Sequence, residues 1–366
     1  MTKEEIIKTK IKAVEDEIRK TPYDKSSEHH HGVLKAKLAK LKDELEGPMN
    51  KGGGGGVGYA IKHSGDASVV LVGLPSVGKS TLLNKITNAE SKVGNYDFTT
   101  LGVVPGMLNY KGVKIQILDL PGIIEKAATG KGFGRKVLSV VRASDMVVLM
   151  TDYKRIDWLS KIEKELYDSG IRININPPKI IVHKTHKGAI QIIDPYKNFD
   201  DETIKDIALE MGFGNAIIQI GEKLDSLDRL IDGLVKSRKY MPLVNVVNKV
   251  DEIASSSASR RTPRNDTLFI SADKGLGIEE LKEKIWEKLG LVRVYLKRER
   301  TSEADKDEPL IIKNDKTVED VLKKISNQMS QDITRVFVWG KKVKFAGQEV
   351  SFSFPVFDEM ELWFGR

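Results

Sequence analysis

The stretch that decides the fold is Gly73-Leu74-Pro75-Ser76-Val77-Gly78-Lys79-Ser80, which has the spacing Gly-x-x-x-x-Gly-Lys-Ser. The apolar run 67–72 before it predicts a buried strand, and residues 81–86 after it predict a helix. This strand–loop–helix context is the one in which such a spacing forms a phosphate-binding loop. Gly73 and Gly78 let the backbone turn several N–H groups toward one phosphate chain, and the helix N-terminus adds partial positive charge.

The loop also supplies the side chains that a nucleotide triphosphate needs. Lys79 is expected to reach the β- and γ-phosphates, and the Ser80 hydroxyl is expected to bind Mg²⁺. A chance glycine-rich turn is the alternative, and the Lys-Ser pair between a strand and a helix argues against it. The predicted nucleotide-binding residues of this loop are Gly73, Pro75, Ser76, Val77, Gly78, Lys79, Ser80 and Thr81.

A second pattern supplies the residues that sense the γ-phosphate. The strand predicted at 114–118 ends in Asp119-Leu120-Pro121-Gly122. Asp119 is expected to lie behind Mg²⁺, and the Gly122 N–H to touch the γ-phosphate. In the polar loop upstream we predict that Thr100 completes the Mg²⁺ ligands; Thr99 is the alternative, and so is a loop in which both only cap the backbone. The predicted metal ligands are Ser80, Thr100 and Asp119, and the predicted catalytic residues are Lys79, Thr100 and Gly122.

A third pattern reads the base. Asn248-Lys249-Val250-Asp251 follows a strand predicted at 244–247. The Asp251 carboxylate can accept two hydrogen bonds from the N1–H and N2–H₂ groups of guanine, a donor pair that adenine lacks. Lys249 is expected to lie along the base, Asn248 to tie this loop to the phosphate loop, and the Ser271-Ala272 backbone to meet the guanine O6. The three patterns together predict a site for GTP and GDP.

Composition sets wider limits. The 366 residues, 40% of them hydrophobic, allow two or three domains with real cores, and no apolar run is long enough to span a bilayer. There is no cysteine, which excludes disulfides and thiol catalysis, and the N-terminus has a charged helical pattern rather than that of a signal peptide. We expect a cytoplasmic protein without a membrane partner. The net charge of +8 favours an anionic partner such as RNA, or only keeps the surface soluble.

The pattern along the chain predicts an α/β protein whose P-loop GTPase domain carries an inserted α+β subdomain. Its predicted parts are a helical hairpin at 1–50, a glycine-rich linker at 51–64, the GTPase domain at 65–171 and 241–290, the insertion at 172–240, and a β-grasp domain at 291–366. The hairpin is predicted from heptad-like apolar residues in 2–20 and 34–45, with His29-His30-His31 in the loop between them. That loop is expected to be a mobile surface, and a metal site is the alternative.

Two segments lack GTPase motifs. In the insertion, strands are predicted at 179–182 and 189–193 and helices at 201–211 and 224–236, with a basic face at Lys179, His183, Lys184, His186 and Lys187. After the helix predicted at 278–289, the C-terminal part has predicted strands at 292–296, 309–312, 334–339, 342–345 and 360–364 and a helix at 318–325. Its basic cluster, which includes Arg293 and Lys297, is a candidate for phosphate contact, although an acidic loop at 301–308 follows it.

With these motifs in view, the chain resembles the developmentally regulated GTP-binding proteins (the DRG family) of the Obg group. The resemblance covers almost the whole length. It is carried by Leu34-Lys35-Ala36-Lys37-Leu38-Ala39-Lys40-Leu41, Gly65-Asp66-Ala67, Pro75-Ser76-Val77-Gly78-Lys79-Ser80-Thr81, Phe98-Thr99-Thr100-Leu101, Leu118-Asp119-Leu120-Pro121-Gly122-Ile123-Ile124-Glu125, Tyr240-Met241-Pro242 and Leu289-Gly290-Leu291-Val292-Arg293-Val294-Tyr295. It implies a helical N-terminal domain, a C-terminal TGS domain, work with ribosomes or ribosomal RNA, and a DRG-family regulatory partner. The chain departs from the family at Lys126-Ala127, where members usually have Gly-Ala, and at residues 354–359, which lack the family's His-x-Leu-x-Asp pattern, so the resemblance does not extend to the TGS ligand contacts.

The catalytic element that orients water is the main open point of the sequence. Ile123 follows the Asp-x-x-Gly motif where many GTPases carry Gln, and an alkyl group can neither orient nor deprotonate water. We therefore expect slow intrinsic hydrolysis, helped by a partner, a ribosome or a monovalent cation; Glu125 and Arg135 are candidates within the chain. Ser76 stands where some potassium-activated GTPases have Asn, so a K⁺ requirement stays open. The alternatives are a nucleotide-gated RNA- or ribosome-binding module with negligible hydrolysis, and an ATPase.

Overall fold

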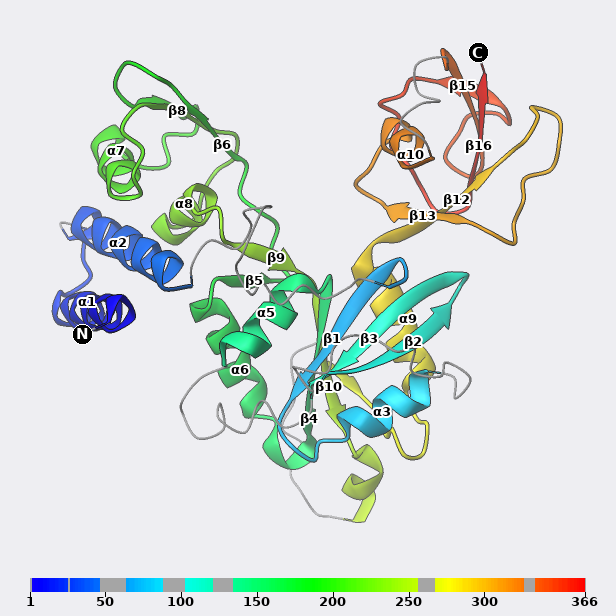
Figure 1. Ribbon diagram of the computed structural model, residues 1–366, viewed down its shortest axis with the longest axis horizontal. Coiled ribbons are helices and arrows are strands. Elements are labelled where there is room, and N and C mark those ends of the chain that lie inside the picture. Colours follow the sequence, from blue (N-terminus) through cyan, green and yellow to red (C-terminus); the bar gives the residue numbers. More distant parts are fainter. Residues whose placement is uncertain are drawn as a thin grey trace. The chain divides into compact units, whose positions relative to one another are not determined.

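The computed structural model describes residues 2–25, 27–46, 64–87, 103–120, 134–255, 267–325 and 333–365. The chain divides into two compact units. Figure 1 labels their helices and strands and colours them along the sequence. The first unit joins residues 1–58 to residues 166–240, and the second joins residues 59–165 to residues 241–366. Within the described part of the chain, no helix is long and apolar enough to cross a membrane.

The second unit is built on a mainly parallel sheet. Its described strands are β1 (Ala67–Gly73), β2 (Val104–Tyr110), β3 (Val113–Asp119), β4 (Met146–Asp152), β10 (Leu243–Asn248) and β11 (Thr267–Phe269), in the order β11-β10-β4-β1-β3-β2. Every residue of β1, β4 and β10 is buried, as expected for strands covered on both faces. The helices of this part are α3 (Lys79–Ile86), α5 (Arg135–Ala143), α6 (Trp158–Asp168) and α9 (Ile278–Leu289). An α/β P-loop domain is therefore confirmed.

Edge strand β2 was not predicted. It contains Pro105 and Gly106, residues that argue against a central strand, and it pairs antiparallel with β3 at the edge of the sheet. A side chain at Gly106 would lie 2.6 Å from Thr87 Cγ2 and 2.8 Å from Leu83 Cδ1. The glycine therefore lets the end of α3 pack closely on this strand.

In the C-terminal part of the second unit, the described residues form a five-stranded sheet and the helix α10 (Val318–Ile325). Its strands are β12 (Leu291–Leu296), β13 (Leu310–Lys313), β14 (Arg335–Trp339), β15 (Gln348–Val350) and β16 (Met360–Gly365), in the order β13-β12-β16-β14-β15. The strand predicted at 342–345 is wrong, because these residues form turns and β15 pairs with β14 instead. Gly347, with φ of 75°, makes the turn that starts β15.

The first unit combines the N-terminal helices with the inserted segment. Helix α1 (Lys3–Lys20) packs along α2 (Glu28–Glu46), and α2 also packs on α7 (Asp201–Glu210) and α8 (Leu227–Leu234). Ala36 and Ala39 of α2 are buried in one core with Ile207 and Leu230. The small alanine side chains allow the helices to approach closely, so these distant segments form one folded body.

The histidine loop prediction was wrong. His29, His30 and His31 lie in the first turn of α2, and the described residues contain no cluster of three potential His, Asp or Glu metal ligands. His31 is buried, and its Nε2 lies 3.1 Å from the carbonyl oxygen of Thr21, at the end of α1. His29 Nε2 pairs with Asp206 Oδ2 at 2.9 Å. These histidines therefore tie elements of the first unit together.

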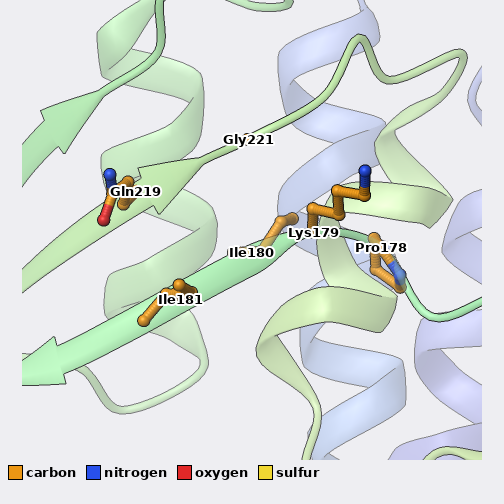
Figure 2. A pocket seen from close by; sticks show the side chains of 6 residues that line it. All are labelled: Pro178, Lys179, Ile180, Ile181, Gln219 and Gly221. Carbon is orange, nitrogen blue, oxygen red and sulfur yellow. The ribbon is translucent and has the colours of Figure 1, made fainter. Parts of the chain in front are cut away.

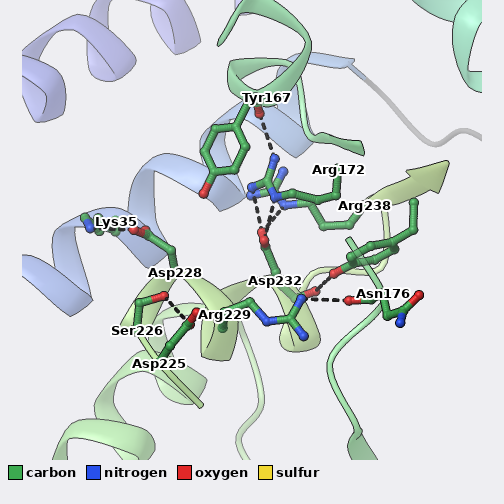
Figure 3. Close-up of polar contacts among 11 residues, drawn as sticks. Lys35, Tyr167, Arg172, Asn176, Asp225, Ser226, Asp228, Arg229, Asp232 and Arg238 are labelled. Carbon is green, nitrogen blue, oxygen red and sulfur yellow. Dashed lines mark hydrogen bonds and ion pairs between the residues drawn. The ribbon is translucent and has the colours of Figure 1, made fainter. Parts of the chain in front are cut away.

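The inserted segment has a three-stranded sheet in the order β6-β8-β7 and a two-stranded sheet of β5 and β9. Its strands are β5 (Ile171–Ile173), β6 (Ile180–Lys184), β7 (Gln191–Ile193), β8 (Ala216–Ile220) and β9 (Lys239–Met241). The prediction missed β5, β8 and β9. Figure 3 shows the polar network beside the short sheet: the Asp232 carboxylate accepts hydrogen bonds from Arg172 and Arg238. This network fastens the start of the insertion to its end.

Candidate nucleotide site

The residues of the three sequence patterns meet at one edge of the parallel sheet. Gly73 ends β1, Asp119 ends β3 and Asn248 ends β10. The register pairs Leu71 with Asp119 and Asn248 with Asp152, so the carboxyl ends of the four central strands share this edge. Open α/β sheets bind ligands in this position.

The two motif glycines are required for different physical reasons. Gly73 has an ordinary negative φ, but a side chain there would lie 2.3 Å from the carbonyl oxygen of Met150, on the neighbouring strand β4. Gly78 has φ of 94°, and a side chain there would lie 2.3 Å from the Asn248 amide nitrogen. The first glycine therefore permits close strand packing, and the second permits both the turn and the contact with the base-reading loop.

Lys79 is held inside the phosphate loop. Its ammonium donates to the carbonyl oxygens of Gly73 and Leu74, at 3.0 and 3.1 Å, and the residue is buried. Burial lowers the pKa of Lys79; the charge of Arg155 adds to this effect, and Asp119 opposes it. A phosphate group would provide the negative charge that this desolvated ammonium lacks.

Ser80 and Asp119 form the predicted metal end of the site. The Ser80 hydroxyl donates to Asp119 Oδ2 at 2.5 Å. Asp119 is fully buried, and its other oxygen, Oδ1, has no hydrogen-bond partner among the described residues. A hydroxyl beside a buried carboxylate with an unmatched oxygen is the hard oxygen donor set that Mg²⁺ prefers, so these residues fit the ion.

Asn248 joins the base-reading loop to the phosphate loop. Its amide nitrogen donates to the carbonyl oxygen of Val77 at 2.8 Å, and its amide oxygen accepts from the backbone N–H of Ala272 at 2.9 Å. Asn248, Val77 and Ala272 are all buried. The link that the sequence suggested from Asn248 to the phosphate loop is present, and the same side chain also holds the Ser271-Ala272 segment.

The base-reading residues lie beside this link. Asp251 is exposed in a short 3₁₀ helix, and Lys249 adopts the left-handed conformation with φ of 64°. A hollow of about 390 Å³ opens between the first turns of α3 and the Ala272 loop, and Ser80, Thr81, Asn84, Lys85, Ala272 and Asp273 line it. Ser80 and Thr81 of the phosphate loop and Ala272 of the base-reading part therefore line one hollow.

The structure adds a cation that sequence patterns missed. Arg155, three residues after the end of β4, donates to the Asp152 carboxylate at 2.5 and 3.0 Å and to the carbonyl oxygen of Pro75 at 3.3 Å. Thr151 donates to the carbonyl oxygen of Arg155 at 2.9 Å. An Asp and an Arg three residues apart at the end of a strand were the available signal, but no motif marks them.

Some predicted residues lie outside the described part of the chain. They are Thr99, Thr100, Gly122, Ile123 and Glu125. For Arg135 the structure describes the backbone, as the first residue of α5. Their predicted roles stay predictions.

The comparisons with known proteins agree with this site. A family described as 50S ribosome-binding GTPases matches residues 68–185, and a companion profile for the C-terminal region of that domain matches residues 187–291. A GTP-binding protein of Methanocaldococcus jannaschii is 44% identical, covering 94% of this chain and 89% of its own. Developmentally-regulated G-protein 3 of Arabidopsis thaliana is 42% identical, covering 96% and 97%, and Ribosome-interacting GTPase 1 of Saccharomyces cerevisiae is 39% identical, covering 96% of each chain.

Fold and site together define a P-loop GTPase. At these identities over nearly the full length, the chain belongs to the family of GTP-binding proteins that includes Developmentally-regulated G-protein 3 and Ribosome-interacting GTPase 1. The resemblance seen in the sequence is confirmed at this level.

Proposed function

We propose that this protein binds GTP with Mg²⁺, hydrolyses it slowly to GDP and phosphate, and uses the change as a switch linked to ribosomes in the cytoplasm. The observation that carries the proposal is the double hydrogen bond of Asn248, to Val77 O and from Ala272 N–H. One side chain thereby fixes the distance between the phosphate loop and the loop that reads the base. A guanine nucleotide that spans both loops matches this arrangement.

Each described residue has a definite part in the proposed reaction. Lys79 neutralises the phosphates, and Ser80 and Asp119 hold Mg²⁺, which would supply positive charge to the β- and γ-phosphate oxygens. The Asp251 carboxylate selects guanine through its two donor groups. Thr100 and Gly122 are proposed to report the γ-phosphate, so their contacts would be released after hydrolysis.

We assign the C-terminal sheet with α10 to the β-grasp (TGS) class, and α1 with α2 to a helical hairpin that shares its core with the insertion. Two members of the basic cluster in this sheet are paired with carboxylates: Arg293 with Asp358 at 2.7 Å and Lys297 with Glu361 at 3.2 Å. These pairs weaken the idea that the cluster binds phosphate. A ribosome and a DRG-family regulatory protein are the proposed partners, following the names of the similar proteins and the sequence resemblance.

The test is phosphate release from GTP with Mg²⁺, in Na⁺ and in K⁺, with and without ribosomes. Stimulation by ribosomes or K⁺ is the expected result, because Ile123 leaves water without an orienting side chain. Tight GTP binding with no turnover in any condition would instead favour the gated binding module. Asp251→Asn should move the preference from guanine to xanthine nucleotides, and an unchanged GTP preference would contradict the base assignment.

A further inference from the structure

The open face of the three-stranded sheet in the first unit carries an apolar row. The register aligns Ile181 of β6, Gln219 of β8 and Ile193 of β7 across the sheet. Ile181 is 53% exposed and Ile193 is 50% exposed, although isoleucine is normally among the most buried residues. Figure 2 shows Ile181 and Gln219 side by side on neighbouring strands.

The other face of this sheet is already covered. Ile180, Val182 and Ile192 alternate with the exposed residues and pack into the core under α7 and α8. The next row of the open face, His183, Ile217 and Gln191, is polar at both ends. The open face therefore offers apolar surface together with amide and imidazole groups that can form hydrogen bonds.

A hollow of about 440 Å³ lies at one end of the apolar row (Figure 2). It is lined by Pro178, Lys179, Ile180, Ile181, Gln219 and Gly221. The hydroxyl of Tyr196, a residue that is 50% exposed, donates to the carbonyl oxygen of Gly221 at 3.5 Å. The hydroxyl of this half-exposed ring therefore lies near Gly221, one of the residues that line the hollow, and a planar ligand can stack on such a ring.

The charge around this face is positive and largely uncompensated. Residues 174–199 contain four lysines and no arginine, and their one carboxylate is Asp194. The Asp194 carboxylate accepts from the backbone N–H groups of Tyr196 and Asn198. Among the described residues, none of the four lysines forms an ion pair; Lys184 lies over the Phe213 ring at 5.3 Å.

We propose that this face, formed by Ile181, Gln219 and Ile193, binds single-stranded RNA together with the exposed Lys179, Lys187 and Tyr196 of the segments that flank its strands. Lysines would contact phosphates, Ile181, Ile193 and Tyr196 would pack against bases, and Gln219 would hydrogen-bond to base edges. Protein interfaces are depleted in lysine and enriched in arginine and aromatic residues, so a lysine-rich face without arginine favours nucleic acid. RNA binding by this face does not depend on the proposed function. The proposed ribosome link enters only as the source of the RNA.

The test uses the full chain and a fluorescein-labelled single-stranded RNA of mixed sequence, titrated by anisotropy at several salt concentrations. In Lys179→Gln/Lys187→Gln, loss of two phosphate contacts should reduce the slope of log K against log salt by about 1.4, or 0.7 for each contact. If the variant and the parent bind equally at 1 M salt, this difference in slope makes the variant bind about 25-fold more weakly than the parent at 0.1 M salt. Ile181→Ser should weaken binding without changing the slope, because a base contact releases no counterions.

The matched control is Lys205→Gln/Lys236→Gln, which removes the same charge from exposed positions on α7 and just after α8. It should keep the affinity and the slope of the parent. An equal loss in this control, or no loss in Lys179→Gln/Lys187→Gln, would overturn the proposal. Unchanged RNA binding with lost ribosome co-sedimentation would also overturn it, and would identify a protein-docking face.

GTP binding and hydrolysis are measured on the same variants and should match the parent. RNA binding through this face in a chain that fails to turn over GTP would leave the inference standing while the proposed catalytic function fails. The two proposals are therefore separable.

Discussion

Removing the Asp232 carboxylate should destabilise the first unit selectively. Asp232 is 4% exposed in its side chain and accepts hydrogen bonds from Arg172 at 2.5 and 2.7 Å and from Arg238 at 2.7 Å. Asp232→Ala leaves two largely buried guanidinium groups without their counterion (Figure 3). Removing one partner of a buried ion pair costs about 3–5 kcal/mol, a large part of the ~5–15 kcal/mol that holds a typical domain folded.

We expect Asp232→Ala to lower the free energy of unfolding of the first unit by about 4 kcal/mol rather than more, because Arg172 keeps two other contacts. It donates to the carbonyl oxygen of Tyr167 at 2.7 Å, and its guanidinium lies 3.7 Å from the centre of the Tyr167 ring. A loss of this size corresponds to about a thousandfold increase in the population of the opened state. It should fall on β5, α8 and β9, the elements that the network connects.

The assay exploits the placement of tryptophan. All four, Trp158, Trp286, Trp339 and Trp363, belong to the second unit, so their fluorescence during urea unfolding reports that unit alone. Amide hydrogen exchange of peptides from 171–173 and 227–241 reports the first unit. Asp232→Ala should lose protection in those peptides by up to roughly a thousandfold, with little change in the tryptophan transition.

Asp228→Ala is the matched control, because Asp228 lies on the same helix and pairs with Lys35 at 2.8 Å in a much more exposed setting. Exposed pairs contribute about 0.2–1 kcal/mol, so its peptides should exchange almost as slowly as in the parent. Equal exchange in the two variants would refute the reasoning. Arg172→Met/Asp232→Leu should recover part of the loss, since apolar side chains replace a buried pair at little cost.

Two further outcomes follow from particular residues. Gly78→Ala should weaken GDP binding at least tenfold, because the left-handed conformation costs an alanine about 1–2 kcal/mol and the new methyl group meets the Asn248 amide. The control is Gly134→Ala, which has open space around it and should bind GDP like the parent. Both variants are measured by fluorescent-nucleotide titration. Burial first, and then the charge of Asp232, raise the pKa of Tyr240 to about 12 from 10.0, so this phenol contributes stability below pH 10 that is lost as pH rises to 12. In Tyr240→Phe, the tyrosinate absorbance that forms near pH 12 should decrease while that near pH 10 is unchanged; loss of the pH 10 signal would contradict the assignment.

The position of the described motif residues at the ends of β1, β3 and β10 was predictable because its signals are local. The phosphate loop and the Asn-Lys-x-Asp pattern each have a fixed spacing next to a strand, and the strand end dictates where the side chains point. Helix α9 was likewise predicted with its observed bounds, Ile278–Leu289. The Arg155 contact with Pro75 has no such signal, because it depends on the packing of β4 beside β1.

The insertion was harder because its strands depend on distant partners. Strand β5 has three residues and pairs with β9, more than 60 residues away. Gly32 falls within the loop predicted between the two N-terminal helices, yet it lies inside α2, where a side chain would lie 3.0 Å from Ile207 Cδ1 and from Leu227 Cδ1. Helix packing requires this glycine, which does not end the helix. Helix propensity alone cannot distinguish a glycine that ends a helix from one that helix packing requires.

Asn248 has a consequence for how the nucleotide site works as a whole. Its side chain bonds to both the phosphate loop and the Ala272 loop, and Gly78 leaves room for it. Displacing this side chain leaves the buried Val77 carbonyl and Ala272 N–H groups without their partner, at about 1–3 kcal/mol for each unsatisfied group. We therefore expect affinity for the base and affinity for the phosphates to be coupled, so that a change confined to one loop weakens binding of the whole nucleotide.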